Sequence, residues 1–288
     1  MSEKAELLMI ILIHRNTQKS RSKNLGLGIV EYLSSRNVTV VSEDEDSKEI
    51  GAEPLSEYKK KKIDYIISLG GDGTILRLIH KYPDIDAPIL GINLGGLGFL
   101  ADIPETEIYP SIQDLLNKKY TIQERLIMQG NSTHGECCLS VNEIAFHRAR
   151  NPTLVDLAIH VDGTYLNTFS ADGIIIATPT GSTAYSLAAG GPILTPELSA
   201  VVLTPISPHT ISNRPVILMP KKEIQVQYIS NLDPIEVACD GISSYHMSNG
   251  EVFRISIAKR KFRLINLPHH DYFTTLRNKL GWSGKLKS

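Results

Sequence analysis

The sequence predicts an α/β protein of two domains: a doubly wound, Rossmann-like N-terminal domain and a mostly β, sandwich-like second domain. Three observations predict this architecture. Between residues 7 and 100, continuously apolar strands alternate with helical segments, as in a parallel sheet covered on both faces. From about Tyr120, short alternating strands and turn signals take over. Residues 271–280 have a helical pattern, and we expect this helix to return to the first domain.

A chain of 288 residues is long enough for two domains that each bury a core. From the change of pattern, we expect the first domain at residues 1–115, completed by the C-terminal segment 266–288. Residues 116–265 would form the second domain.

The first domain begins with the apolar run 7–13, which is typical of a strand buried on both faces. Residues 24–34 have apolar positions at helical spacing, and residues 38–41 are expected to form the second strand. The run 7–13 is too short for a membrane span or for an ordinary signal sequence. We therefore expect a soluble, cytoplasmic protein.

The most informative stretch is the turn Gly70-Gly71-Asp72-Gly73-Thr74, which follows the apolar strand 63–69 and precedes the helical segment 75–79. Glycine permits a positive φ and a close approach to a bound group, and amides at a helix N-terminus suit phosphate oxygens. A carboxylate there would repel phosphate unless a cation or a proton in transfer offsets its charge. Asp72 is therefore our candidate general base, or the acceptor that orients an attacking hydroxyl. The alternative is a tight turn whose aspartate caps the helix.

The next strand, 87–92, leads into a second glycine-rich loop, 93–100. Its glycines match the G-x-G-x-x-A spacing of a dinucleotide-binding fingerprint, but Pro104 follows where the helix of that motif should continue. We therefore interpret this stretch as a loop that approaches a ligand, with Phe99 available to stack on a flat ring.

The second domain carries hairpin signals. Residues 155–161 alternate in polarity, Asp162-Gly163 favours a tight turn, and residues 164–169 return. Asp240-Gly241 and Asn249-Gly250 repeat the signal. These features predict a mostly β domain.

Residues 170–186 run from an apolar strand into a turn rich in Thr, Pro, Gly and Ser. Hydroxyls and amides that cluster where a helix begins can bind sugar hydroxyls or phosphates, and Tyr185 offers a ring face or a hydroxyl. The alternative is ordinary turn chemistry with a serine or threonine cap.

Composition limits the partners. Thirty basic and 31 acidic residues give a net charge of −1, so no overall field draws the protein to nucleic acid or to a membrane. The cysteines Cys137, Cys138 and Cys239 form neither a disulfide framework nor a metal-ligand spacing. We expect them to be packed thiols in a reducing compartment.

Taken in order, a set of motifs between positions 63 and 245 resembles the NAD kinase family. The motifs are Gly70–Thr74, Gly91–Leu100, Val141–Glu143, Asp172-Gly173, Thr178–Tyr185 and Pro208–Pro215. Lipid kinases of the diacylglycerol type and 6-phosphofructokinases share a similar first turn, but the ordered set is specific.

The resemblance implies a two-domain enzyme that phosphorylates the adenosine-ribose 2′-hydroxyl of NAD to give NADP. The donor would be ATP or polyphosphate, used with a divalent cation such as Mg²⁺. The resemblance also implies a homo-oligomer, a dimer or a tetramer, and the charge balance predicts no nucleic-acid or membrane partner.

The resemblance makes Asp72 the proton acceptor for the 2′-hydroxyl and puts Gly73 beside it in the NAD site. Asn142 and Glu143 would hold the adenosine end, and Phe99 would lie against the adenine and ribose pocket. The other residues expected to bind NAD, most of them in the second domain, are Arg77, Asp172, Thr183, Ala184, Tyr185, Ser186 and Asp240. Each has a structural alternative as a strand end, a turn or a surface residue. We assign no residue as a metal ligand.

Two positions depart from the family pattern. Ser170 stands two residues before Asp172, where many members have a basic residue, and Ile242 stands where Gln is common. Arg77 and Arg148 are the nearest candidates to supply positive charge, although either can also be a surface arginine.

Three other functions fit parts of the sequence. A lipid kinase with the same turn should carry an apolar or basic membrane-facing stretch, which this sequence does not show. A dinucleotide-sensing module would bind NAD or NADP without turnover, and the intact Asp72 argues against it. The density of Gly, Asp and Thr at strand ends argues against a purely structural protein.

Overall fold

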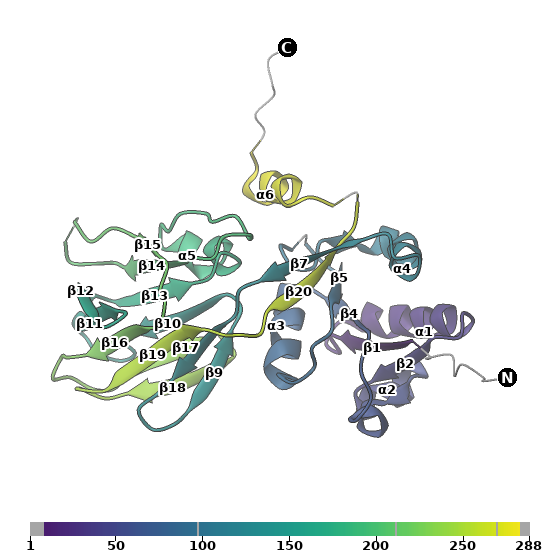
Figure 1. Ribbon diagram of the computed structural model, residues 1–288, viewed down its shortest axis with the longest axis horizontal. Helices are drawn as coiled ribbons and strands as arrows, with labels where there is room; N and C mark the ends of the chain where they lie inside the picture. Colours follow the sequence, from purple (N-terminus) through teal and green to yellow (C-terminus); the bar gives the residue numbers. More distant parts are fainter. Residues whose placement is uncertain (1–8, 97, 211, 269, 283–288) are drawn as a thin grey trace, which may run out of the picture. The chain divides into compact units, whose positions relative to one another are not determined.

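The protein is described by a computed structural model that covers residues 9–96, 98–210, 212–268 and 270–282 (Figure 1). It divides into two compact units. Unit 1 comprises Met1–Gln123 and Arg263–Ser288, and unit 2 comprises Glu124–Phe262. The chain thus crosses between the units after residues 123 and 262, whereas the sequence pattern suggested crossings after residues 115 and 265.

The described part of unit 1 is built on an eight-stranded sheet of order β3-β2-β1-β4-β5-β20-β7, with β6 paired to β5. The strands are β1 (Ile10–Arg15), β2 (Thr39–Ser42), β3 (Glu53–Pro54), β4 (Tyr65–Gly70), β5 (Ile89–Asn93), β6 (Ile103–Pro104), β7 (Thr121–Arg125) and β20 (Phe262–Asn266). Strands β2, β1, β4 and β5 are parallel, and the chain winds outward from β1 in both directions. This confirms the predicted doubly wound sheet, although residues 7 and 8 of the first predicted strand lie outside the described residues.

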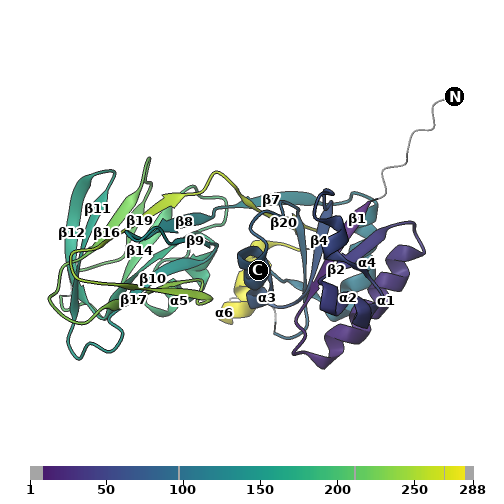
Figure 2. The ribbon, with the colours of Figure 1, turned by 90° about the horizontal axis from the view of Figure 1, so that it is seen from below.

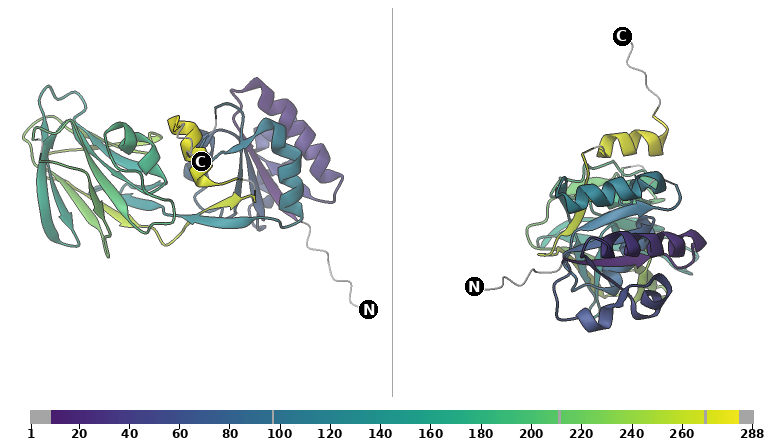
Figure 3. Two further views of the ribbon diagram at one scale, coloured as in Figure 1. Left: turned by 90° about the horizontal axis from the view of Figure 1, so that it is seen from above. Right: turned by 90° about the vertical axis from the view of Figure 1, so that its right-hand side faces the viewer.

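Helices cover both faces of this sheet. They are α1 (Ser20–Ser34), α2 (Asp44–Ile50), α3 (Asp72–Lys81) and α4 (Ile108–Leu116), with the single 3₁₀ turns η1 (Leu55–Tyr58) and η2 (Glu105–Glu107). Helix α6 (Tyr272–Leu280) also belongs to unit 1. Helices α1 and α4 lie side by side on one face, where the ring centroids of Tyr32 and Tyr109 are 5.2 Å apart (Figure 3). Their core includes Leu90 and Ile92 of β5. A Cβ added to Gly91, between them, would point to the other face, where it would overlap the Leu100 carbonyl and crowd Ile75 of α3.

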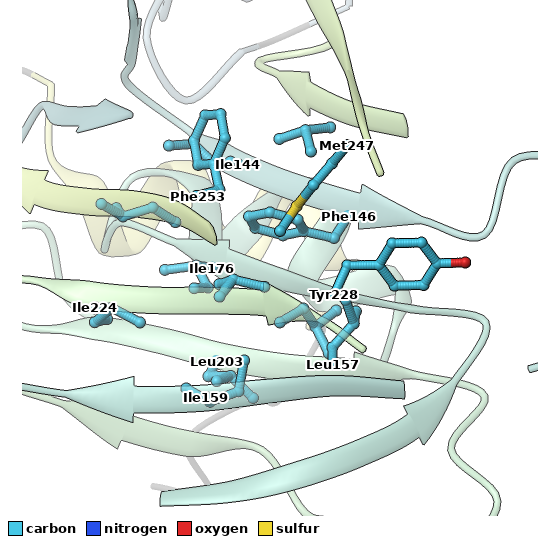
Figure 4. Close-up of a cluster of buried hydrophobic side chains, with 14 of the residues drawn as sticks. Ile144, Phe146, Leu157, Ile159, Ile176, Leu203, Ile224, Tyr228, Met247 and Phe253 are labelled. Atoms are coloured by element: carbon cyan, nitrogen blue, oxygen red, sulfur yellow. The ribbon is translucent and has the colours of Figure 1, made fainter. Parts of the chain in front are cut away.

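Unit 2 consists of two antiparallel sheets, of order β15-β14-β13-β10-β17-β18 and β12-β11-β16-β19-β8-β9. Its elements are β8 (Met128–Asn131), β9 (Cys137–Ser140), β10 (Glu143–His147), β11 (Val155–Val161), β12 (Thr164–Ala171), β13 (Gly173–Ala177), η3 (Gly181–Thr183), α5 (Tyr185–Ala188), β14 (Val201–Ile206), β15 (Val216–Leu218), β16 (Ile224–Tyr228), β17 (Ile235–Cys239), β18 (Ser243–Met247) and β19 (Val252–Ile257). One buried core joins the sheets, with Phe146 from β10, Leu157 from β11 and Phe253 from β19 (Figure 4). The predicted sandwich-like domain is confirmed.

Unit 2 is an insertion into the sheet of unit 1. The chain leaves through β7 and returns through β20, and these two strands are neighbours in that sheet (Figure 2). Helix α6 follows β20, belongs to unit 1 as expected, and buries Thr275 and Leu276.

The expectation that all three cysteines are thiols is wrong. Cys138 of β9 and Cys239 of β17 form a disulfide, with their Cα atoms 6.7 Å apart, and Cys137 alone is free. The partners are 101 residues apart in sequence. The two strands approach only because the sheets of unit 2 pack together, and the spacing of cysteines along the chain carries no record of that packing.

Candidate active site

The turn expected to carry the chemistry connects β4 to α3 in unit 1. Gly70 ends the strand and Asp72 begins the helix, so Asp72 lies at the carboxyl edge of the parallel strands. Gly71 has an extended backbone, with φ of −163°, and none of the described glycines with positive φ belongs to this turn. The positive φ that glycine permits is therefore not used in this turn. A Cβ on Gly70 would overlap the Thr74 side chain, so close packing is what requires glycine here.

The carboxylate of Asp72 is bound to the second glycine-rich loop. It accepts hydrogen bonds from three successive backbone amides, those of Phe99 at 2.8 Å, Leu100 at 3.1 Å and Ala101 at 2.9 Å. A Cβ on Gly98 would overlap this carboxylate. An ionised carboxylate offers about four acceptor positions, so Asp72 can still accept one more hydrogen bond, for example from a hydroxyl.

Asn93, to which sequence reasoning gave no role, organises this loop from inside. It is buried at the end of β5, where its amide group donates to the carbonyls of Gly96 at 2.8 Å and Ala101 at 2.9 Å. Its side-chain oxygen accepts from the amide of Gly95 at 2.7 Å. A lone amide residue directly after an apolar strand is the sequence signal that could have identified it, since buried polar groups need partners.

A cavity of about 360 Å³ lies beside this loop in unit 1. It is lined by Arg21, Asn93, Leu94, Gly95, Pro104 and Glu105. Lys19, just before α1, donates from Nζ to the carbonyl of Leu94 at 3.1 Å. The cavity thus combines loop backbone with one basic and one acidic side chain, Arg21 and Glu105, whose charged groups lie 3.8 Å apart.

The other predicted residues of unit 1 lie around the turn. The Phe99 ring packs against α6, with its centroid 6.1 Å from that of Tyr272 and 5.6 Å from Nζ of Lys279. Gly73 and Arg77 are exposed at the start of α3. Stacking of Phe99 on a ligand ring stays a prediction.

In unit 2, the predicted pair Asn142 and Glu143 lies where β10 begins. The amide of Thr178 donates to the carbonyl of Asn142 at 2.8 Å, and the Asp240 carboxylate accepts from the amides of both Asn142 and Glu143. Gly181 packs so closely on the Asn142 backbone that a Cβ there would overlap it. The backbone of this pair is therefore fixed by its surroundings, while no hydrogen bond to another described residue occupies the side chain of Asn142.

The carboxyl group of Glu143 has an unusual environment. Burial raises its pKa from 4.5 to about 7, the negative charge of Asp240 acts in the same direction, and a hydrogen bond from the Tyr185 amide opposes them. Its Oε2 atom is buried and has no hydrogen-bond partner within the described part of the chain. Such an oxygen either carries a proton or awaits a donor from a ligand.

Tyr185 is paired with His147, which sequence reasoning missed. The two rings are stacked with centroids 5.5 Å apart and planes 10° apart, and the Tyr185 hydroxyl lies 2.7 Å from Nε2 of His147. His147 is opposite Gly173 in the pairing of β10 with β13. Only this register brings His147 to Tyr185, so no local sequence signal could have identified it.

The neighbours of Tyr185 differ in accessibility. Thr183 ends the η3 turn and Ala184 follows it, and both are partly buried. That they line a ligand pocket stays a prediction. Ser186 is fully buried, and its hydroxyl lies 2.8 Å from that of Thr204 on β14. Ser186 is therefore not exposed at the surface, and its expected contact with NAD stays a prediction.

Asp172 forms an ion pair with Arg148. The Nε atom of Arg148 lies 2.7 Å from Oδ1 of Asp172, and the Arg148 amide donates to the Asp172 carbonyl at 2.9 Å. The hydroxyl of Ser170, which replaces the family's basic residue, bonds to Asp156 instead. Arg148 therefore provides the positive charge beside Asp172 that Ser170 cannot.

Within the described residues, no group of three or more His, Cys, Asp or Glu side chains could hold a metal ion. Nor does any helix in the described part of the chain have the length and apolarity needed to cross a membrane.

Comparison with known proteins identifies the family. Residues 10–120 match the model of the ATP-NAD kinase N-terminal domain, and residues 141–267 match that of the C-terminal domain. An NAD kinase of Protochlamydia amoebophila (strain UWE25) is 57% identical over 278 residues, which cover 96% of this chain and 100% of the relative. An NAD kinase of Moorella thermoacetica is 37% identical and covers 93% of this chain and 88% of its own length.

Solved structures agree. The crystal structure of yeast NADH kinase complexed with NADH superimposes with a TM-score of 0.83 at 26% identity, covering 97% of this chain and 89% of the yeast chain. An NAD kinase from Archaeoglobus fulgidus in complex with ATP gives a TM-score of 0.75 at 27% identity, covering 96% of this chain and 100% of the other. The sequence motifs, the fold and these matches together show that the chain belongs to the NAD kinase family.

Proposed function

We propose that this protein transfers the γ-phosphoryl group of ATP to the 2′-hydroxyl of the adenosine ribose of NAD, giving NADP and ADP. The observation that carries the proposal is Asp72. Its carboxylate stands at the start of α3, in a chain that matches both ATP-NAD kinase domains, and it is tied to the second glycine-rich loop with acceptor capacity to spare.

Phosphoryl transfer asks the protein mainly for positioning and charge stabilisation. In our proposal, the Asp72 carboxylate accepts the hydrogen of the 2′-hydroxyl and orients its oxygen. As the new O–P bond forms and the bond to the ADP oxygen breaks, the proton moves to Asp72. The donor phosphates would lie at the carboxyl edge of the unit 1 sheet, near Arg21 and Lys19.

A divalent cation such as Mg²⁺ is expected to accompany the donor. Mg²⁺ is commonly held by one or two carboxylates, by substrate phosphates and by water. Because no group of three or more possible ligands occurs among the described residues, we propose that the donor phosphates and water hold the ion. The ion would neutralise phosphate charge when bound.

For unit 2, we propose that Asn142, Glu143 and Tyr185 bind the adenosine part of NAD. The free side chain of Asn142 and the unpartnered Oε2 of Glu143 are suited to ribose hydroxyls or base edges. Thr183 and Ala184 would line the same pocket, and Asp172 with Arg148 would act toward the nicotinamide half. Polyphosphate as an alternative donor is included in this proposal and in its test.

The family resemblance also leads us to propose a cytoplasmic homo-oligomer, a dimer or a tetramer. Exposed Ile217 and Met219, at the edge strand β15, are candidates for the contact. Light scattering on the purified protein tests the oligomer. The Cys138–Cys239 bond is at odds with a cytoplasmic location, because disulfides persist mainly in oxidising compartments. Cell fractionation tests the location.

The deciding experiment measures NADP formation with NAD, Mg²⁺ and either ATP or polyphosphate, for the wild-type protein and for Asp72→Asn. Turnover that is lost in the variant supports the kinase and names the donor. If the wild type binds NAD saturably but shows no turnover with either donor, a dinucleotide-sensing function would replace the kinase proposal.

A further inference from the structure

Asp240 is placed by a tight turn at the end of β17. Asp240 and Gly241 both have positive φ, 51° and 63°, and the amide of Ile242 donates to the carbonyl of Cys239 at 3.0 Å. Positive φ at two successive positions is what Asp-Gly and Asn-Gly turns provide. The turn buries Asp240, which is only 9% exposed.

The buried carboxylate accepts four hydrogen bonds from one segment, and we call this arrangement the Asp240 clamp. Oδ1 accepts from the Ser140 hydroxyl at 2.5 Å, the Asn142 amide at 2.8 Å and the Glu143 amide at 3.1 Å. Oδ2 accepts from the Val141 amide at 2.9 Å. In return, the amide of Asp240 donates to the carbonyl of Glu143 at 3.0 Å.

We propose that Asp240 is a positioning residue for NAD, which fixes the backbone of Asn142 and Glu143 so that their side chains meet the adenosine end. The inference rests on the proposed function, in which these two residues bind NAD. Both Asp240 oxygens are engaged by donors inside the chain, so Asp240 acts through the segment 140–143 rather than by touching NAD.

The clamp has an electrostatic consequence in addition to its geometry. Three amides and a hydroxyl satisfy the buried Asp240 carboxylate, which would otherwise be costly to desolvate. Its negative charge also acts on the Glu143 carboxyl and helps to raise the pKa of that group. Removing the charge should therefore move the titration of Glu143 to lower pH.

The chain offers a matched control in Asp162. Asp162 and Gly163 also form a turn with positive φ, 53° and 85°. The Asp162 carboxylate likewise accepts from three successive amides, those of Lys221 at 2.9 Å, Lys222 at 2.8 Å and Glu223 at 3.1 Å. This second clamp holds the 221–223 segment, which includes none of the proposed NAD-binding residues.

The experiment compares Asp240→Asn and Asp162→Asn with the wild type. Asparagine keeps each turn, because Asn-Gly suits the same backbone, but it removes the charge and turns one acceptor into a donor. We expect Asp240→Asn to raise the KM for NAD about tenfold, the size expected for weakened charge-assisted hydrogen bonds. The KM for ATP should stay within about twofold, and the pH inflection of kcat/KM for NAD should move lower.

Hydrogen exchange provides an independent readout. The amides of Val141, Asn142 and Glu143 should exchange faster in Asp240→Asn. Asp162→Asn should change neither the exchange of these amides nor the KM for NAD nor the pH profile. Faster exchange with an unchanged KM and pH inflection would overturn the proposal. Equal effects of the two substitutions would also overturn it, because they would mark a general loss of stability.

Two further measurements keep the test decisive. If Asp240→Asn does not fold, Ser140→Ala removes one donor of the clamp and should raise the KM for NAD about threefold, whereas no change would contradict the proposal. If the wild type binds NAD without turnover, the kinase proposal fails alone, and calorimetric NAD affinities of the same variants decide the positioning role. If the wild type binds no NAD, the kinase proposal and the positioning proposal both fail.

Discussion

The ring of Tyr185 is stacked on the ring of His147, with centroids 5.5 Å apart, and its hydroxyl lies 2.7 Å from Nε2 of the same histidine. His147 therefore lies against the hydroxyl end of Tyr185 and orients the ring. The pair makes His147 a support for a residue that we propose binds adenosine.

Replacing His147 with alanine should weaken NAD binding without abolishing turnover. A stacked aromatic pair contributes about 0.5–1.5 kcal/mol beyond area burial, so the KM for NAD should rise about 2- to 12-fold. Tyr185→Phe keeps the stack and loses only the hydroxyl contact, and its effect should be smaller. An unchanged KM in His147→Ala, measured beside Tyr185→Phe, would remove the supporting role.

Asp72→Asn should lower kcat about 10²- to 10⁴-fold, the usual contribution of a general base. The KM for NAD should change only a few-fold, because asparagine keeps one oxygen for the amides of Phe99–Ala101. Steady-state kinetics measure this effect. The control is Asp84→Asn, which removes an exposed carboxylate of the same unit and shows the effect of losing one charge. Full activity in Asp72→Asn would exclude Asp72 as the general base. Loss of NAD binding would show that Asp72 acts mainly by binding NAD.

Glu143 should make the protein less stable as the pH rises from about 4.5 to about 7. Its pKa is raised in the folded protein, so the folded state holds the proton more tightly than the unfolded chain in that range. The free energy of unfolding should fall across this window by on the order of 3 kcal/mol.

Urea unfolding at pH 5 and pH 7.5 checks this, with Glu143→Gln as the control. The variant should lose the slope, because its amide does not titrate. Glu43, whose pKa is lowered to about 2 chiefly by its hydrogen bond with His14, contributes stability that is lost only below about pH 4.5, so it does not mask the effect. Identical slopes for the wild type and Glu143→Gln would contradict the burial argument.

The disulfide predicts a thiol count. The denatured, unreduced protein should contain one titratable thiol, Cys137, and the reduced protein should contain three. Reduction should lower the free energy of unfolding by about 2–5 kcal/mol, because the bond closes a long loop. Three thiols before reduction would show that Cys138 and Cys239 are not joined.

Gly181→Ala should disturb the proposed adenosine site through the backbone. The new Cβ would overlap the backbone of Asn142, and overpacking of this kind costs about 1–3 kcal/mol. We expect a lower melting temperature and a raised KM for NAD. Gly96→Ala is the control, since a Cβ there meets no atom within 4 Å. Equal behaviour of the two variants would refute the close approach.

The sequence predicted what depends on local pattern. Continuous apolar runs identified the parallel strands, and Asp162-Gly163 and Asp240-Gly241 both form the turns expected of them. What it missed depends on register and packing. Asn93 acts through a folded loop, and His147 reaches Tyr185 only through strand pairing. Asp240 was expected to bind NAD, and no local feature indicates that its carboxylate faces residues almost 100 positions earlier.

The neighbouring strands β7 and β20 imply an order of events during synthesis. The strands β1 to β5 emerge from the ribosome first, but β20, which pairs with β5, follows only after the whole of unit 2. Closing that loop costs less entropy once unit 2 has folded and shortened the distance between its own ends. Until β20 is synthesised, the β5 side of the nascent sheet lacks this partner strand. The sheet that begins with β1 is therefore completed only by a strand near the C-terminus.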